Sequence, residues 1–178
     1  MRIIAGIARG RRLTVPKGDR VRPTLDRVRE ALFSILAPRI AGANFLDLFA
    51  GSGANGIEAL SRGAASALFV DNHPDSLACI KKNLELTGFA NRGRCQRSAL
   101  PQDLARVSGD FDVIFADPPY GFTGYTELLE AIAQTGKLAT DGEIVIEHPR
   151  KLDLPAEIAT LRQTQQRHYG TTTLSFYA

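Results

Sequence analysis

Cysteine is scarce in this sequence, and long apolar runs are missing altogether. Only Cys79 and Cys95 are present among 178 residues, which excludes a disulfide scaffold and a cysteine-rich zinc site and is typical of a reducing compartment. No apolar stretch approaches the ~20 residues that cross a bilayer, and the first residues lack the apolar core of a signal peptide. We therefore expect a cytoplasmic protein with no membrane partner and with both cysteines in its core.

The remaining composition is that of an ordinary globular domain. Hydrophobic residues make up 44% of the chain and charged residues 23%. The length allows one domain with a sizeable core, and no repeat, low-complexity tract or linker divides it. We expect a single domain over residues 1–178, with a basic N-terminal hairpin or arm at 1–22 and an α/β core at 23–178.

Positive charge is concentrated near the N-terminus. Residues 1–40 hold ten of the 22 Lys and Arg but only three acidic residues, a net charge of +7, and the other residues carry a net charge of −4. Such an arm favours a polyanion partner, most simply nucleic acid, although the same arginines could merely form a solvated surface. The candidate binding residues are Arg2, Arg9, Arg11, Arg12, Arg20, Arg22, Arg27 and Arg29.

Strand-like and helix-like segments alternate through the rest of the chain. The expected strands are Asn44–Leu48, Ala67–Asp71, Arg94–Arg97, Asp112–Asp117 and Glu143–Glu147. Helical patterns cover Leu25–Leu36, Asn55–Arg62, Pro74–Thr87, Pro101–Val107 and Thr126–Thr135. This alternation predicts an α/β fold with a mostly parallel sheet covered on both faces and right-handed crossovers.

Two hairpins are expected at the ends of the chain. Leu161–Tyr169 and Thr171–Tyr177 flank Gly170, and the second of them should enter the sheet antiparallel to its neighbours, which gives a seven-stranded sheet. Arg2–Ala5 and Arg11–Val15 could pair as a small basic hairpin.

A glycine-rich loop joins the first expected strand to its helix. Gly51 and Gly53 allow a ligand to approach the backbone closely, and N–H groups at a helix start favour an anionic group. Asp71, at the end of the next strand, can accept both hydroxyls of a ribose. The segment containing Ser98 and Ala99 follows the third strand, where it could meet an adenine. These positions predict a ligand that contains adenosine; a structural turn and a helix-capping acid are the plainer alternatives.

The more specific motif is Asp117-Pro118-Pro119-Tyr120, at the end of the fourth strand. Two prolines fix the backbone and remove two amide donors, which leaves carbonyl oxygens as acceptors. Asp117 and the Pro118 carbonyl could accept the two N–H bonds of an exocyclic amine while the base stacks on Tyr120. The alternative is a proline-stiffened turn after a buried strand.

The loop and the proline motif together resemble the class I S-adenosylmethionine-dependent amino-methyltransferases, which have a Rossmann-like fold. More closely, the whole chain is similar to the RsmD family, bacterial enzymes that methylate guanine N2 in 16S ribosomal RNA. The segments that carry this similarity are Arg2–Gly6, Arg9–Leu13, Arg22–Glu30, Asp47–Arg62 and Asp117–Tyr120, with a weaker match at Ile144–Glu147.

The resemblance implies S-adenosylmethionine as the cofactor and 16S rRNA, in the small subunit or an assembly intermediate, as the partner of a monomeric enzyme. Its implied target is guanine 966 in the family's nucleotide labelling. The catalytic residues would be Asp117, Pro118, Pro119 and Tyr120. The cofactor would contact Asp47 (near its ammonium), Phe49, Ala50, Gly51, Ser52, Gly53, Gly56, Asp71, Asn72, Ser98, Ala99 and Thr24. Position 71 is Asp where relatives often have Glu, and position 98 is Ser where Asp or Asn is common.

Other functions remain open at this point. The proline motif also occurs in DNA adenine methylases, so adenine-N6 methylation of DNA or RNA is the main alternative. Two further alternatives are an RNA protein that binds a nucleotide without catalysis and a dehydrogenase. Neither of them explains the proline motif. No metal is expected, because His73, His148 and His168 are widely separated in the sequence.

Overall fold

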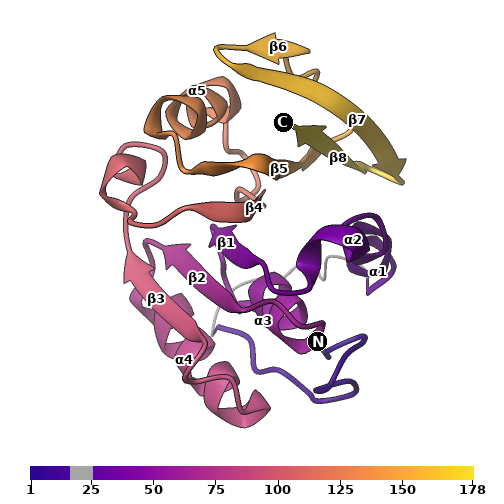
Figure 1. Ribbon diagram of the computed structural model, residues 1–178, viewed down its shortest axis with the longest axis vertical. Helices are drawn as coiled ribbons and strands as arrows, with labels where there is room; N and C mark the ends of the chain where they lie inside the picture. The colour runs from indigo at the N-terminus through magenta and orange to yellow at the C-terminus, as the bar shows by residue number, and fades with distance from the viewer. Residues whose placement is uncertain (17–25) are drawn as a thin grey trace.

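The computed structural model describes residues 1–16 and 26–178, and its centre is one twisted sheet (Figure 1). The strand order is β3-β2-β1-β4-β5-β8-β7-β6, and β1 to β5 run parallel to one another. The strands are β1 Asn44–Leu48, β2 Ser66–Asp71, β3 Gly93–Arg97, β4 Phe111–Ala116, β5 Leu138–Pro149, β6 Glu157–Ile158, β7 Leu161–Tyr169 and β8 Thr172–Tyr177. The predicted α/β class and mostly parallel sheet are confirmed.

The carboxyl-terminal half of the sheet is antiparallel, as predicted. Strand β8 lies between β5 and β7 and runs antiparallel to both. All seven expected strands are present, and β6, which pairs with the start of β7, adds a short eighth strand at the edge. Strand β5 also begins at Leu138 rather than at the expected Glu143. Leu138 pairs with Phe111 of β4, and after an irregularity in β5 the pairing continues with Glu143 opposite Val113.

The predicted helices are present except at one segment. The helices are α1 Asp26–Ile35, α2 Ala37–Ile40, α3 Ala54–Ser61, α4 Pro74–Thr87 and α5 Tyr125–Thr135, and of these α2 is a short helix that the sequence did not predict. The helix expected at Pro101–Val107 is reduced to a single 3-10 turn, η1 Leu104–Arg106. Over the described residues, no helix is long and apolar enough to span a membrane.

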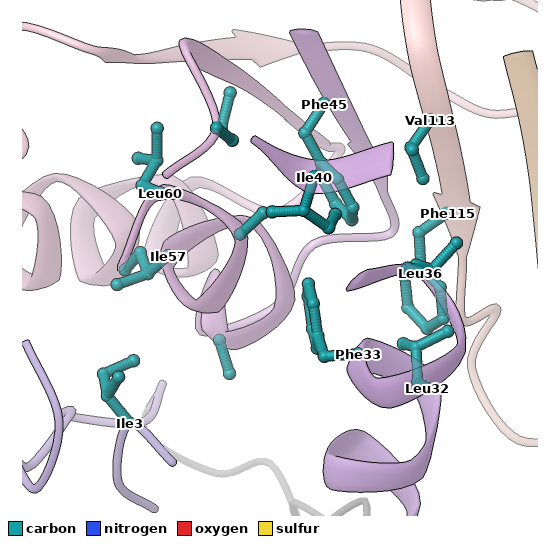
Figure 2. Close-up of a cluster of buried hydrophobic side chains, with 14 of the residues drawn as sticks. Ile3, Leu32, Phe33, Leu36, Ile40, Phe45, Ile57, Leu60, Val113 and Phe115 are labelled. Carbon is teal, nitrogen blue, oxygen red and sulfur yellow. The ribbon is translucent and has the colours of Figure 1, made fainter. Parts of the chain in front are cut away.

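The two faces of the sheet pack against different helices, so the strands alternate between two cores. Phe45 and Phe115 point toward α1, α2 and α3, where they join Phe33, Leu36 and Ile57 (Figure 2). The intervening strand residues face η1 and α5 on the other side. Successive residues of a strand thus point into opposite cores, as expected for a sheet that is buried on both faces.

The basic N-terminal segment packs on the outer side of α3. Its two arms pair around the Arg2–Arg12 bridge, where the Ile3 N–H donates to the Arg11 carbonyl at 3.0 Å and the Leu13 N–H to the Met1 carbonyl at 3.1 Å, so a hairpin forms over a shorter span than expected. Gly6 lies so close to α3 that a Cβ there would be 1.9 Å from the Ser61 carbonyl oxygen. The Ser61 side chain accepts the Ala8 N–H at 3.0 Å. These contacts fix the arm to the core.

A buried carboxylate, Glu58 on α3, ties the arm and α1 together. The backbone N–H groups of Ile4 and Ala5 donate to its two oxygens at 2.8 and 2.9 Å, and Arg62 Nε donates at 2.8 Å. Arg29 Nε lies 3.9 Å from the same carboxylate. Glu58 is fully buried, so its charge depends on these partners, most of which are distant in the sequence.

The two cysteines differ in their surroundings. Cys79, on α4, is buried and donates to the Thr14 carbonyl oxygen at 3.3 Å. Cys95 lies on β3, which is the edge strand, and is only partly buried. The expectation that both lie in the core is therefore wrong for Cys95, because the chain places no further strand beyond β3 among the described residues.

Candidate functional site

A cavity of about 1230 Å³ opens at the carboxyl ends of the parallel strands. Its wall combines the glycine loop after β1, the segment after β2, the proline motif after β4 and the end of β5. Among the described residues, three carboxylates (Asp71, Asp117 and Glu147) and two arginines (Arg27 and Arg29) line it. Ligands of open α/β sheets bind at this edge, and the carboxylates after β2, β4 and β5 can bind donor or positively charged groups of a ligand.

The glycine loop adopts conformations that ordinary side chains disfavour. Gly51 and Gly53 have φ of +54° and +76°, and Gly53 leads directly into α3. Phe49, at the start of the loop, also has a positive φ of 58°, which is uncommon for a bulky residue. The Ala50 N–H donates to the Val70 carbonyl at 3.1 Å. Of the expected loop contacts, Phe49, Ala50, Gly51 and Ser52 line the cavity.

Asp47 lies behind this loop rather than on the cavity wall. Its carboxylate is buried and accepts the Gly56 N–H at 2.9 Å. Burial raises the pKa of Asp47 well above its usual range, and the nearby charges of Asp117 and Asp71 act in the same direction. Gly56 must be glycine, since a Cβ there would come within 2.3 Å of the Phe69 ring. Asp47 thus fixes the shape of the loop.

Asp71 both lines the cavity and supports the loop. Its Oδ2 accepts the Gly51 N–H at 2.9 Å, and its Oδ1 accepts the His73 N–H at 2.8 Å. Each carboxylate oxygen has capacity for a further hydrogen bond. The neighbouring Asn72 is exposed on the same wall.

Ser98 and Ala99 do not line the cavity. The Ser98 N–H donates to the Asp71 carbonyl at 3.2 Å, and its hydroxyl accepts from Gln96 at 3.1 Å. The Ala99 N–H donates to the Asp103 carboxylate at 3.1 Å. Their predicted contact with an adenine stays a prediction.

All four residues of the proline motif line the cavity. Asp117 is half-buried and Pro118 is buried, whereas Pro119 and Tyr120 are exposed. The Phe122 N–H donates to the Pro119 carbonyl at 3.0 Å and closes a turn. This turn leaves the Tyr120 side chain 99% exposed, so its ring is accessible for stacking.

Among the cavity residues that were not predicted as site residues are Tyr125, Glu147 and His148. Burial, assisted by the charges of Asp117 and Glu147, raises the pKa of Tyr125 to about 12. The signal that could have found two of them is the Glu147-His148-Pro149 run, which follows an apolar strand just as the proline motif does.

His148 is a neutral, buried histidine. Its Nδ1 lies 3.0 Å from the Pro149 carbonyl oxygen, which can only accept, so Nδ1 carries the proton. Its Nε2, 2.8 Å from the Ser175 hydroxyl, then accepts. Burial lowers the pKa of His148. No cluster of three or more potential metal-binding side chains occurs among the residues that the structure describes.

The predicted RNA-binding arginines fall into three groups. Arg2, Arg9, Arg11, Arg12 and Arg27 are exposed, and Arg27 also lines the cavity. Arg20 and Arg22, together with the predicted cofactor residue Thr24, lie outside the described residues. Arg29 corrects the expectation, because its side chain is only 1% exposed. It donates to the Arg2 carbonyl and, at 3.0 Å, to Asp26, so it holds the arm and does not face solvent.

Comparison with known proteins gives full-length matches. The family model described as "Conserved hypothetical protein 95" matches residues 1–178. The putative rRNA methyltransferase YlbH of Bacillus subtilis is 39% identical over 180 residues, which cover 99% of this chain and 98% of the relative. The ribosomal RNA small subunit methyltransferase D of Escherichia coli is 37% identical over 177 residues, 99% of this chain and 89% of the relative.

Solved structures agree with these relatives. The putative methyltransferase yhhF from Escherichia coli superposes with a TM-score of 0.84 at 36% identity, and the match covers 99% of this chain and 96% of the other. A hypothetical protein of Thermus thermophilus has the same TM-score at 33% identity, with 99% and 98% coverage.

Proposed function

The chain belongs to the RsmD family and is an rRNA methyltransferase, and we propose that it transfers a methyl group from S-adenosylmethionine to the exocyclic N2 of a guanine in 16S rRNA. The observation that carries the proposal is the meeting of Asp117–Tyr120, Asp71 and the glycine loop around one cavity. By family resemblance, the target is guanine 966.

The residues present fit S-adenosylmethionine. The cavity is large, three carboxylates lie on its wall, and Gly51 presents backbone without a side chain. When bound, the cofactor supplies a methyl group on a positively charged sulfur, which leaves as a neutral thioether once a nitrogen has taken the methyl. In the proposal Asp71 accepts the ribose hydroxyls, Asn72 borders the adenosine, and Phe49–Ser52 hold the methionine part. Thr24, Ser98 and Ala99 remain proposed contacts on the resemblance alone.

The proline motif holds the amine that is methylated. Tyr120 stacks on the guanine, and the Asp117 carboxylate and the Pro118 carbonyl accept the two N2–H bonds. The nitrogen lone pair then points toward the methyl group, and the proton released on transfer passes to Asp117 or to water. Catalysis comes mainly from this alignment, so no strong base is needed.

The exposed arginines of the arm bind the RNA backbone. Arg9, Arg11 and Arg12 offer cationic side chains on a segment anchored to α3, where they can contact phosphates. The target base must be presented outside a helix, because a duplex hides its amino edge. We propose a monomer that acts in the cytoplasm on the small subunit or an assembly intermediate.

The decisive experiment is methyl transfer from labelled S-adenosylmethionine to small ribosomal subunits that lack the modification. The RNA is digested to nucleosides and analysed by mass. Label in N2-methylguanosine supports the proposal, and label in N6-methyladenosine replaces it with the adenine alternative. Absence of label on subunits, naked RNA and DNA, with cofactor binding intact, contradicts the proposal.

A further inference from the structure

Two carboxylates lie side by side on the cavity wall. Strands β4 and β5 are parallel with Ala116 opposite Ile146, so the next residues along them, Asp117 and Glu147, are neighbours. Both line the cavity, and Glu147 is nearly buried. Phe115 and Val145, two residues earlier on each strand, belong to the same core, so the strand alternation puts both acids on one face of the sheet. Adjacent strands are separated by ~4.8 Å, a distance that one planar base can span.

A second observation joins the two acids. Tyr125, which begins α5, is buried and lines the same cavity. Burial, and after it the charges of Asp117 and Glu147, raise the pKa of its hydroxyl, so both carboxylates lie near this one side chain. The proposed function uses Asp117 to hold the amine and gives Glu147 no role.

The hydrogen-bonding edge of guanine supplies a role for Glu147. Guanine presents two adjacent donors, its N2 amine and its N1–H, whereas N1 of adenine is a bare acceptor. A carboxylate facing N1 accepts a hydrogen bond from guanine and meets a lone pair of adenine. Discrimination of this kind is strong when the mismatched polar group is buried and left without a partner.

We propose that Glu147 determines the specificity for guanine by accepting its N1–H while Asp117 holds the neighbouring N2 amine. This inference rests on the proposed function and names the residue that selects the base. Glu147 thus contacts the substrate without taking part in the transfer of the methyl group.

The test uses two substrates that share the reacting amine and differ at N1 and C6. Small subunits are reconstituted with RNA carrying either guanosine or 2-aminopurine riboside at the position that the wild-type enzyme methylates. 2-Aminopurine keeps the amine but has a lone pair at N1 and no oxygen at C6, and the loss of that oxygen is common to the wild type and the variant. The readout is the ratio of kcat/KM for guanosine to kcat/KM for 2-aminopurine, which is independent of the fraction of active protein.

The wild type is expected to prefer guanosine, and Glu147→Gln, whose amide can donate to a bare N1, is expected to lower the ratio about 10- to 100-fold, the range of a charge-assisted hydrogen bond. Glu143→Gln, a change of the same kind in the middle of β5 and outside the cavity lining, should leave the ratio unchanged. If the Glu147 variant turns over neither substrate, the ratio is taken from its equilibrium affinities for the two subunits.

Two results overturn the inference alone: no preference for guanosine in the wild type, or a ratio in Glu147→Gln that equals the wild-type ratio. A wild type that makes no N2-methylguanosine on unmodified subunits overturns the proposed function, and the inference falls with it.

Discussion

The Asp47 carboxylate accepts the backbone N–H of Gly56 at 2.9 Å, across the full width of the glycine loop. In the middle of the loop, the Asp71 carboxylate accepts the Gly51 N–H at the same distance. Carboxylates from two neighbouring strands thus hold the loop and the start of its helix at two points. The loop is shaped before any ligand arrives, which lowers the entropy that binding must overcome.

Asp47 is expected to act on the loop rather than directly on the cofactor. Asp47→Ala leaves the buried Gly56 N–H without its acceptor and should lower the free energy of unfolding by about 1–3 kcal/mol, measured by urea denaturation. Asp47→Asn keeps an acceptor and removes a buried charge, so its stability should equal or exceed that of the wild type. Its affinity for S-adenosylmethionine, measured by calorimetry, should stay within about threefold, less than the loss of a buried ion pair would cause. A tenfold or larger loss would instead support the contact with the cofactor ammonium.

Asp117 is expected to be needed for turnover and not for cofactor binding. Asp117→Ala removes the acceptor that orients the amine, and misalignment of a reacting group typically costs about 100-fold or more in rate. Turnover is measured by label transfer to unmodified subunits and cofactor binding by calorimetry. Asp141→Ala, which removes an exposed acid at the far end of β5, is the matched control. Wild-type turnover in Asp117→Ala would refute the assignment.

The exposed arm arginines are expected to set the salt dependence of RNA binding. Replacing Arg9, Arg11 and Arg12 with Ala should weaken binding and reduce the slope of log K against log[salt] by about 2, since each lost phosphate contact removes about 0.7–0.9. Arg162→Ala, an exposed arginine on β7, serves as the control. An unchanged affinity and slope in the triple variant would mean that the arm is only a solvated surface.

Buried His148 is expected to make the protein sensitive to mild acid. The unfolded chain takes up a proton on this residue below about pH 6.5, whereas burial lowers the pKa in the folded state. The unfolded state therefore binds more protons as the pH falls, and the free energy of unfolding decreases.

This pH effect can be isolated by substitution. Urea denaturation at pH 7 and pH 5 should show a smaller loss of stability in His148→Asn than in the wild type. His73→Asn removes an exposed histidine and should behave as the wild type does. Parallel pH curves for the wild type and His148→Asn would show that another group is responsible.

Local patterns in the sequence determined the elements. The predicted bounds of β1 and α4 are those observed, because a period of two and a period of 3.6 are properties of neighbouring residues. The antiparallel C-terminal strand was also predictable, since Gly170 separates two extended segments that are too close for a crossover. The order of the glycine loop, Asp71 and Asp117 along alternating strands predicted that they would meet at one edge.

Only the tertiary structure decided which charged residues are buried and which face the cavity. Arg29 lies in the basic segment and its type predicts exposure, yet it is buried against Asp26 and Glu58. Glu58 looks like a surface acid of α3, but it binds the backbone of Ile4 and Ala5, more than fifty residues away. A charge can be buried only where partners compensate it, and no local pattern records the partners that are distant in the sequence. The pairing of Glu147 with Asp117 has the same origin, because it exists only in the register between β4 and β5.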